Sequence, residues 1–379
     1  ASGFWKRSLF HYKRGKGHFI PYIWNRVRWH IFPRLHLAGS YPDHVDLELS
    51  SSCNMVCPMC YTVTELFKRE VPHRSMDFDL FRKVVDELAS NNVYSIRLSW
   101  RGEPTLNKHF MDCVRYAKQR GIREVDSLTN ALRLTPAMFE ELVDICKEYN
   151  FRFIRMSTNG VLIKNRISAI RKLDSVNVSM DSYDSDTFYK YRKGTQKQFD
   201  QIIDGLEILS KKGIKFSLSY VLSKENLHEA FKMIDFSEKM KADLVHFHNI
   251  NPHGSDQFST LMIQDENTIQ FLNNILERTD YPFDITLPVI IDPKSPSFTE
   301  TRCRQPWSYL LYNSLGNVAY CCHLDHDKEI GNVFEGYDIN SPKMKEFREA
   351  IVEGKQVEMD SCRLCQRRFT GQEFGSFSR

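Results

Sequence analysis

Three cysteines within eight residues constrain this 379-residue chain more than any other feature. Cys53, Cys57 and Cys60 have the spacing C-x3-C-x2-C, in the run Ser-Ser-Cys-Asn-Met-Val-Cys-Pro-Met-Cys-Tyr. A structural zinc site takes four protein ligands, and no histidine lies near enough to Cys60 to complete such a set locally. Each iron of a 4Fe–4S cluster needs one outside ligand, so three cysteines leave one iron open. The spacing favours a cluster that binds a small molecule over a closed zinc site.

This motif resembles that of the radical S-adenosylmethionine (SAM) superfamily, in which the open iron binds the amino and carboxylate groups of SAM. The resemblance implies that an electron from the reduced cluster cleaves SAM to methionine and a 5′-deoxyadenosyl radical. That radical then removes a hydrogen atom from the substrate. The chain departs from the family at Met59, where an aromatic residue is usual, and has Tyr61 beyond the third cysteine. A closed zinc site or a purely structural cluster is the alternative.

Composition places the chain among ordinary globular proteins, with 41% hydrophobic and 26% charged residues. A net charge of +4 is too small to make nucleic acid an obligate partner. The sequence contains no run of about twenty apolar residues, so it predicts no membrane-spanning helix. The amino-terminal residues do not resemble a signal peptide. Ten cysteines, most of them in two tight groups, argue against a secreted disulfide scaffold. We therefore expect a cytoplasmic protein.

The first 42 residues contain no acidic residue, eight Lys or Arg, and ten aromatic residues. Interleaved basic and aromatic residues are typical of segments that lie on a membrane surface or bind nucleic acid. The plainer interpretation is a terminal extension that packs its aromatic residues on the main domain. We expect docking to an anionic or membrane-associated surface as the functional alternative, which would place the protein peripherally at the membrane.

From about residue 44 the chain alternates β-prone runs with helical patterns, which predicts a parallel sheet wound with helices. The expected strands are 44–49, 94–100, 125–129, 151–157, 175–180, 216–221 and 244–248, with helices at 80–90, 106–120 and 136–148. The fold class is α/β, a partial (β/α)6-7 TIM-like barrel with a small carboxyl-terminal β-hairpin-plus-helix domain. We expect an extension at 1–43, a core barrel at 44–255, a linker at 256–300 and an auxiliary domain at 301–379. Functional loops in such folds gather at the carboxyl ends of the strands.

Several strand-end motifs resemble those with which the family binds SAM. Arg101-Gly102-Glu103-Pro104 resembles the Gly-Gly-Glu-Pro element, and the resemblance implies that Gly102 and Glu103 receive the amino group of SAM. Ser157 and Asn159 resemble a strand-end Thr-Asn-Gly element, Ser179 and Asp181 a Ser-x-Asp element, and Arg192 an arginine that meets the SAM carboxylate. Asn130 ends a second, similar strand. The chain thus has one strand–helix unit more than the usual six, or one of the seven predicted strands is not in the sheet, and either asparagine could contact SAM.

A second group of cysteines lies near the carboxyl end. Cys303, Cys321, Cys362 and Cys365, with twelve residues between Cys303 and Gly316, resemble the SPASM/twitch extension of radical SAM enzymes. Tyr309–Asn313 and Val318–Cys321 flank a turn at Gly316 and predict a β-hairpin. The resemblance implies one auxiliary 4Fe–4S cluster held by those four thiolates, with Cys322 as a substitute ligand. A four-cysteine zinc site is the alternative.

Histidines near these motifs are candidates for proton transfer. His246 and His248 alternate on one predicted strand, so both point to the same face, and His323 follows the second cysteine group. Imidazole is suited to removing a proton from a substrate radical. We therefore predict His246, His248 and His323 as catalytic candidates, with surface or core histidines as the plainer interpretation.

Four protein ligands would close the auxiliary cluster to substrate, which favours electron transfer as its task. The leading hypothesis is oxidation or epimerisation at a carbinol carbon of a sugar, cyclitol or glycan intermediate. The alternatives are a maturase acting on a ribosomally made peptide, an RNA-modifying enzyme, and a non-catalytic metal-binding protein. We expect a small-molecule, glycan or peptide substrate and a flavodoxin, ferredoxin or reductase as electron donor.

Overall fold

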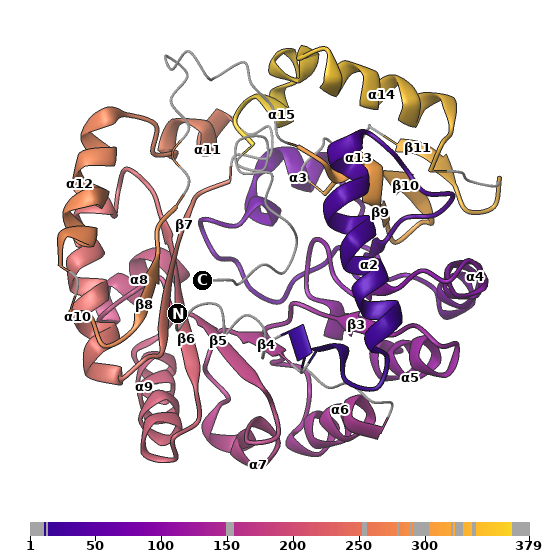
Figure 1. Cartoon of the computed structure of the whole chain (residues 1–379). Helices are drawn as coiled ribbons and strands as arrows, with labels where there is room; N and C mark the ends of the chain where they lie inside the picture. Colours follow the sequence, from indigo (N-terminus) through magenta and orange to yellow (C-terminus); the bar gives the residue numbers. More distant parts are fainter. Residues whose placement is uncertain are drawn as a thin grey trace.

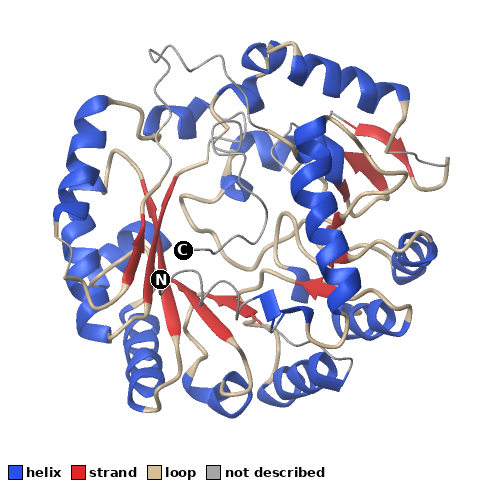
Figure 2. Cartoon of the chain, in the orientation of Figure 1, coloured by secondary structure: helices blue, strands red, loops and turns tan. Residues whose placement is uncertain are grey.

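The computed structural model describes most of the chain. The described residues are 11–12, 14–148, 155–251, 256–278, 280–288, 290, 303–319, 321–322, 329–335 and 339–365. Helices surround two groups of strands in Figures 1 and 2. In the described ranges no helix is both long and apolar enough to cross a bilayer.

Two sheets carry the fold. The first has the order β11-β10-β9-β1-β2-β3, and the second runs β4-β5-β6-β7-β8 with all neighbours parallel. The strands are β1 His44–Leu47, β2 Ser95–Arg97, β3 Glu124–Asp126, β4 Arg155–Thr158, β5 Ser175–Ser179, β6 Phe216–Leu222, β7 Leu244–Asn249, β8 Asp284–Thr286, β9 Tyr309–Tyr312, β10 Asn317–Ala319 and β11 Glu329–Asn332. Among the described residues no ladder joins β3 to β4, so the strands form the partial barrel that the sequence predicts.

Most of the helices follow a strand along the chain and lie on the outer side of the sheets (Figure 2). They are α2 Phe19–Ile31, α3 Glu65–Glu70, α4 Phe78–Ser90, α5 Phe110–Gln119, α6 Pro136–Glu148, α7 Ile167–Ile170, α8 Ser185–Arg192, α9 Gln196–Lys211, α10 Ala230–Met240, α11 Asp256–Leu261, α12 Glu266–Glu277, α13 Gln305–Ser308, α14 Pro342–Val352 and α15 Asp360–Arg363. Side-chain caps fix several starts: Asp184 and Thr195 begin α8 and α9 with capping boxes. These starts place Arg192 at the end of α8.

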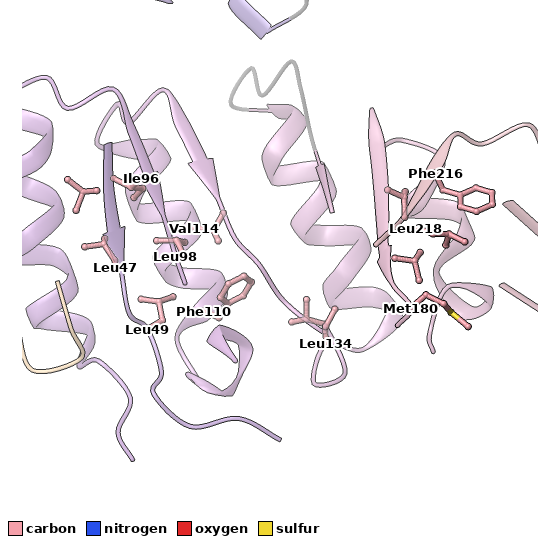
Figure 3. Close-up of a cluster of buried hydrophobic side chains, with 14 of the residues drawn as sticks. Leu47, Leu49, Ile96, Leu98, Phe110, Val114, Leu134, Met180, Phe216 and Leu218 are labelled. Atoms are coloured by element: carbon pink, nitrogen blue, oxygen red, sulfur yellow. The ribbon is translucent and has the colours of Figure 1, made fainter. Parts of the chain in front are cut away.

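The alternation of side chains along each strand separates a helix-facing core from a polar inner face. Figure 3 shows the core packing of Leu47 and Leu49 with Ile96 and Leu98, near Phe110 of α5. The intervening polar side chains take the opposite face of their strands; they include Asp46, Glu48, Arg97, Asn177, Asp181, Ser217, Ser219 and His246. Parallel strands buried on both faces normally carry apolar residues throughout. This polar inner face is therefore the candidate location of a functional site.

The seven strands predicted from the sequence are all present, although residues 149–154 lie outside the described ranges. The strands before Asn130 and Asn159, β3 and β4, are both present. The chain therefore has the additional strand–helix unit. An eighth parallel strand, β8, pairs with β7 inside the segment predicted as a linker. Only three residues long, β8 is too short to leave a period-2 pattern in the sequence.

The carboxyl-terminal hairpin is joined to the first sheet. β9 pairs in parallel with β1, with His44 opposite Tyr309, and β10 and β11 continue antiparallel from β9. Gly316 makes the predicted turn with φ +82°, a region that favours glycine. Beneath the ladder, the Tyr309 hydroxyl donates to Asp46 Oδ2 over 2.8 Å, and Asp46 accepts from His44 Nε2 at 3.0 Å. The strand that leads to the three-cysteine loop is thus also the partner of the hairpin.

Candidate functional site

The predicted site residues gather at the carboxyl ends of five consecutive parallel strands. The three-cysteine loop follows β1, Glu103 follows β2, Asn130 follows β3, Asn159 follows β4 and Asp181 follows β5. Ligand-binding groups in α/β folds lie at this end of the sheet. The backbone topology therefore brings together the motifs that the sequence only places in order.

The three cysteines differ in exposure. Cys53 reaches the surface, Cys57 is buried and Cys60 is half-buried. Desolvation by the surrounding protein raises the pKa of the Cys53 thiol to about 11, and Cys60, Glu103 and Cys57 add to the effect. Burial also raises the pKa of Cys57. Iron would have to displace the protons of these thiols on binding.

Two findings bear on whether this loop fits a cluster. In the described part of the chain, no three His, Cys, Asp or Glu side chains converge as they would around a single metal ion. A 4Fe–4S cluster instead takes each thiolate at a different iron. Three neighbouring thiols, one of which reaches the surface, are a donor set that fits such a cluster.

Gly102 packs directly against the start of the three-cysteine loop. Its φ is +67°, and an added Cβ would lie 2.5 Å from the carbonyl oxygens of Ser50 and Ser52. The next amide, of Glu103, donates to the Ser52 carbonyl over 2.8 Å. Glycine is therefore required at position 102, because the backbone of the cysteine loop approaches it closely.

The Glu103 carboxylate is buried and ties neighbouring strand ends together. It accepts from the Thr105 amide at 3.1 Å and the Asn130 amide at 2.7 Å, and the Thr129 hydroxyl also donates to it. It is close enough to Cys53 to raise the pKa of that thiol. A fixed carboxylate beside the cysteine loop suits an ammonium group, which would form a charge-assisted hydrogen bond there.

Both candidate asparagines contact the three-cysteine loop. Asn130 Nδ2 donates to Asn54 Oδ1 over 2.8 Å, and Asn159 Nδ2 lies 3.3 Å from Met55 Sδ. Ser157 is half-buried near the end of β4. The two strand ends that the sequence offered as alternatives therefore both contact the three-cysteine loop.

Arg192 links the end of α8 to the three-cysteine loop. Its guanidinium forms an ion pair with buried Asp181, and its Nη1 lies 3.7 Å from Cys57 Sγ. Burial disfavours the charged guanidinium, but Asp181 and Cys57 outweigh it and raise the pKa of Arg192. Asp181 has a φ of +51° and accepts from the Val221 amide at 2.5 Å. Ser179, half-buried on β5, lies opposite Ser219 of β6.

A buried ion pair explains the arginine in place of the family's first glycine. Arg101 donates to both oxygens of Glu48, at 2.6 and 3.0 Å, and its guanidinium lies 3.6 Å from the Trp100 ring centroid. Glu48 also accepts from the Ser314 amide in the β9–β10 turn at 3.1 Å. Sequence reasoning missed Glu48, because an acidic residue at a strand end gives no sign of its partner.

The carboxyl-terminal cysteines are more enclosed. Cys321, Cys322 and Cys365 are buried, whereas Cys303 and Cys362 are half-buried. A hydrogen bond with Cys322 raises the pKa of Cys321, and burial and the thiols of Cys365 and Cys303 raise it further. The Cys362 carbonyl accepts from the Cys365 amide at 3.1 Å. The four predicted ligands and Cys322 thus belong to one region.

Two sets of contacts join the cysteine groups. Trp100 Nε1 donates to the Cys322 carbonyl over 2.9 Å. A small apolar cluster also spans both groups; it comprises Ile250, Phe258, Met262 and Leu364, with Met59, Tyr61, Val221 and Leu261 packed against it. Met59, the departure from the family motif, therefore lies where the first cysteine loop meets the segment between Cys362 and Cys365.

His246 and His248 lie on one face of β7, as the alternation predicts. Their rings stack with centroids 5.9 Å apart, and His246 Nδ1 lies 2.8 Å from Thr286 Oγ1 of β8. His248 is the exposed member of the pair. Desolvation by the surrounding protein lowers the pKa of His248, and Asp181 partly opposes this. His323 lies outside the described residues.

Comparisons with known proteins agree with this arrangement. The radical SAM superfamily model matches residues 47–157 and 143–237, about half of the chain, and the SPASM iron–sulfur cluster-binding domain matches residues 303–366. A probable GTP 3′,8-cyclase of Saccharolobus solfataricus is 25% identical over 239 residues, which cover 62% of this chain and 65% of that protein. The match thus spans less than two thirds of the relative's length.

Two solved structures have the same fold. SuiB of Streptococcus suis, bound to its precursor peptide SuiA, covers 93% of this chain and 77% of its own, with 14% identity and a TM-score of 0.53. The structure of anSMEcpe with AdoMet and a Cp18Cys peptide covers 86% of this chain and 88% of its own, with 17% identity and a TM-score of 0.53. At these identities the likeness shows the fold.

Proposed function

Since the chain belongs to the radical SAM superfamily and carries a SPASM domain, we propose that it oxidises or epimerises a carbinol carbon of a sugar, cyclitol or glycan intermediate. The two family models imply SAM, a 4Fe–4S cluster that cleaves it to a 5′-deoxyadenosyl radical, and an auxiliary iron–sulfur cluster able to accept an electron. The residues of this chain bind these groups, and one of them accepts a proton from the substrate.

We assign the cluster ligands from the two cysteine groups. Cys53, Cys57 and Cys60 hold the cluster that leaves one iron open. The auxiliary cluster is held by Cys303, Cys321, Cys362 and Cys365. Supporting this division, the Cys365 amide donates to the Cys362 carbonyl at 3.1 Å, and Cys321 and Cys365 are both buried.

The polar strand ends are assigned to SAM. Glu103 is held in place by its neighbours and suits the amino group. Asn159 and Ser157 at the end of β4, and Ser179 at the end of β5, are assigned to the ribose and carboxylate. Arg192, which lies between Asp181 and Cys57, supplies the positive charge for the SAM carboxylate.

One observation carries the oxidation proposal: His248 is exposed on the same face of β7 as His246, with the two ring centroids 5.9 Å apart. Oxidising a carbinol breaks its C–H and O–H bonds and forms a C=O bond. Bound SAM would supply the radical that takes the hydrogen atom, and the auxiliary cluster would take the remaining electron, so this chain's own residues must supply a base for the hydroxyl proton. His248 can accept that proton, and the developing imidazolium is stabilised by Asp181.

A peptide substrate is the second candidate. The two neighbours named above are bound to peptides and share the fold over most of this chain. The same His248 could then remove a proton next to a peptide radical. Substrates deuterated at the reacting carbon separate the two candidates, because deuterium recovered in 5′-deoxyadenosine identifies the class that reacts.

The test of His248 uses anaerobically reconstituted protein with SAM, dithionite and panels of deuterated sugars and peptides. We expect deuterium transfer from a sugar carbinol, and His248→Gln should lower product formation at least about a hundredfold while SAM cleavage continues. His228→Gln, at an exposed histidine, is the matched control and should keep full turnover. Transfer from peptides alone would replace the sugar proposal, and full turnover by His248→Gln would remove the base.

A further inference from the structure

Helix α2, drawn in indigo in Figure 1, has buried residues on one face and exposed apolar side chains on the opposite face. Tyr22, Asn25 and Trp29 are its buried residues. Its exposed face consists of large apolar side chains at helical spacing: Phe19, Ile20, Ile23, Trp24, Val27 and Ile31. Ile20 is 83% exposed and Trp24 is 56% exposed. A contiguous exposed apolar stripe of this kind marks an interaction surface.

The helix is held in this orientation by specific contacts. Arg14, just before α2, donates to both carboxylate oxygens of Glu124 at 2.7 and 2.6 Å, and Arg28 pairs with Asp43 at 3.1 Å. The Trp29 ring meets the His44 ring edge-on, with centroids 6.1 Å apart. Since these contacts fix the inner face, the apolar stripe cannot turn inward without breaking them.

Charge identifies the occupant of the stripe. Residues 1–42 carry eight Lys or Arg and no acidic residue, and two of the eight, Arg14 and Arg28, are paired with Glu124 and Asp43. Lys16 and Arg34 are exposed before and after the stripe. A helix with large apolar side chains on one face and basic residues around them lies in the interface of an anionic membrane. We propose that α2 docks this protein on an anionic lipid surface, with the apolar stripe inserted among the lipids.

The contacts of α2 also say which end of the sheet faces the lipid. Glu124 is the first residue of β3, His44 is the first residue of β1, and Asp43 precedes it. The helix therefore lies at the amino ends of these strands, whereas the cysteine loop and Glu103 lie beyond their carboxyl ends. The docked protein directs its catalytic end away from the membrane. This proposal is independent of which substrate reacts.

Vesicle flotation with the full chain tests the proposal. The protein should float with vesicles of phosphatidylcholine and phosphatidylglycerol, and binding should weaken on raising the salt concentration. Ile20→Ser/Trp24→Ser should lower the affinity more than about tenfold, and Lys16→Ala/Arg34→Ala should lower it several-fold. Val352→Ser, at an exposed apolar residue of α14, is the matched control and should bind as the unsubstituted chain does.

Far-UV circular dichroism of each variant separates lost binding from lost folding. If flotation is absent, or if Ile20→Ser/Trp24→Ser binds as tightly as the unsubstituted chain, the proposal fails. Light scattering identifies another occupant: a dimer that this variant dissociates, without vesicle binding, assigns the stripe to a second copy and overturns the lipid proposal. Equal binding to pure phosphatidylcholine would likewise overturn the role of the basic residues.

Discussion

The two cysteine groups are built differently. The first is a loop beyond the end of β1, in which Cys53 reaches the surface; backbone hydrogen bonds join Ser51 to Arg74 and Ser52 to Glu103 at its start. The second is anchored by a hairpin hydrogen-bonded into the sheet, and three of its five cysteines are buried. An exposed loop leaves room for a small-molecule ligand, whereas an enclosed group favours a cluster with protein ligands only. The contrast agrees with a catalytic task for the first group and electron transfer for the second.

Cys57→Ala should have the largest effect. We expect 5′-deoxyadenosine formation to fall to background, because the loop would keep only two of three proposed cluster ligands. The assay is SAM cleavage with dithionite after anaerobic reconstitution. Cys146→Ala, a half-buried thiol in α6, is the control and should keep full activity. SAM cleavage by Cys57→Ala would contradict the assignment of Cys57 as a ligand of the cluster with the open iron.

Cys362→Ala should separate the two groups. We expect iron content to fall from about eight to about four per chain, with SAM cleavage retained and oxidised product lost. Iron and sulfide analysis and product formation are measured on the same sample. Cys322→Ala is the control that should keep both clusters, and if it instead loses the second cluster, Cys322 is a ligand in place of Cys321. Full turnover by Cys362→Ala would contradict the electron-transfer task.

Glu48→Gln tests the ion pair that connects the two regions. The variant leaves buried Arg101 without its anion, so the free energy of unfolding should fall by about 3–5 kcal/mol. Urea denaturation of cluster-free protein measures this. Glu48→Gln/Arg101→Met should recover much of the loss because no unpaired charge remains. If the single variant is as stable as the unsubstituted chain, the pair does not hold the hairpin to the cysteine loop.

Asp43, which directly precedes β1, should give a smaller effect on the free energy of unfolding, and this effect depends on pH. Burial raises the pKa of its carboxyl group from 3.8 to about 6, against the pull of Arg28. The folded chain keeps this proton where the unfolded chain has released it, so the free energy of unfolding falls as pH rises from about 4 to about 6. The loss is at most about 3 kcal/mol, and Asp43→Asn should flatten it. An unchanged pH profile in urea denaturation would contradict the shift.

Local patterns in the sequence predicted much of this arrangement. The strands after which Glu103, Asn159 and Asp181 lie have period-2 apolar residues, and cysteine spacing needs no tertiary information. The pairing of β9 with β1 could not be predicted, because it joins residues more than two hundred positions apart. The Arg101–Glu48 pair was also missed, because its two members end different strands 53 positions apart. The basic, aromatic composition of residues 1–42 was visible, but only the packing of α2 shows which face is exposed.

The ladder between β1 and β9 has a consequence for synthesis. During translation β1 leaves the ribosome long before Tyr309–Tyr312, so one edge of this strand waits unpaired while most of the chain is made. An unpaired edge is a template for wrong strand pairing, and contacts this distant in sequence form slowly. The newly made chain is therefore prone to wrong strand pairing until β9 has been synthesised. Chaperones, or early insertion of an iron–sulfur cluster into the neighbouring loop, would have their largest protective effect during this period.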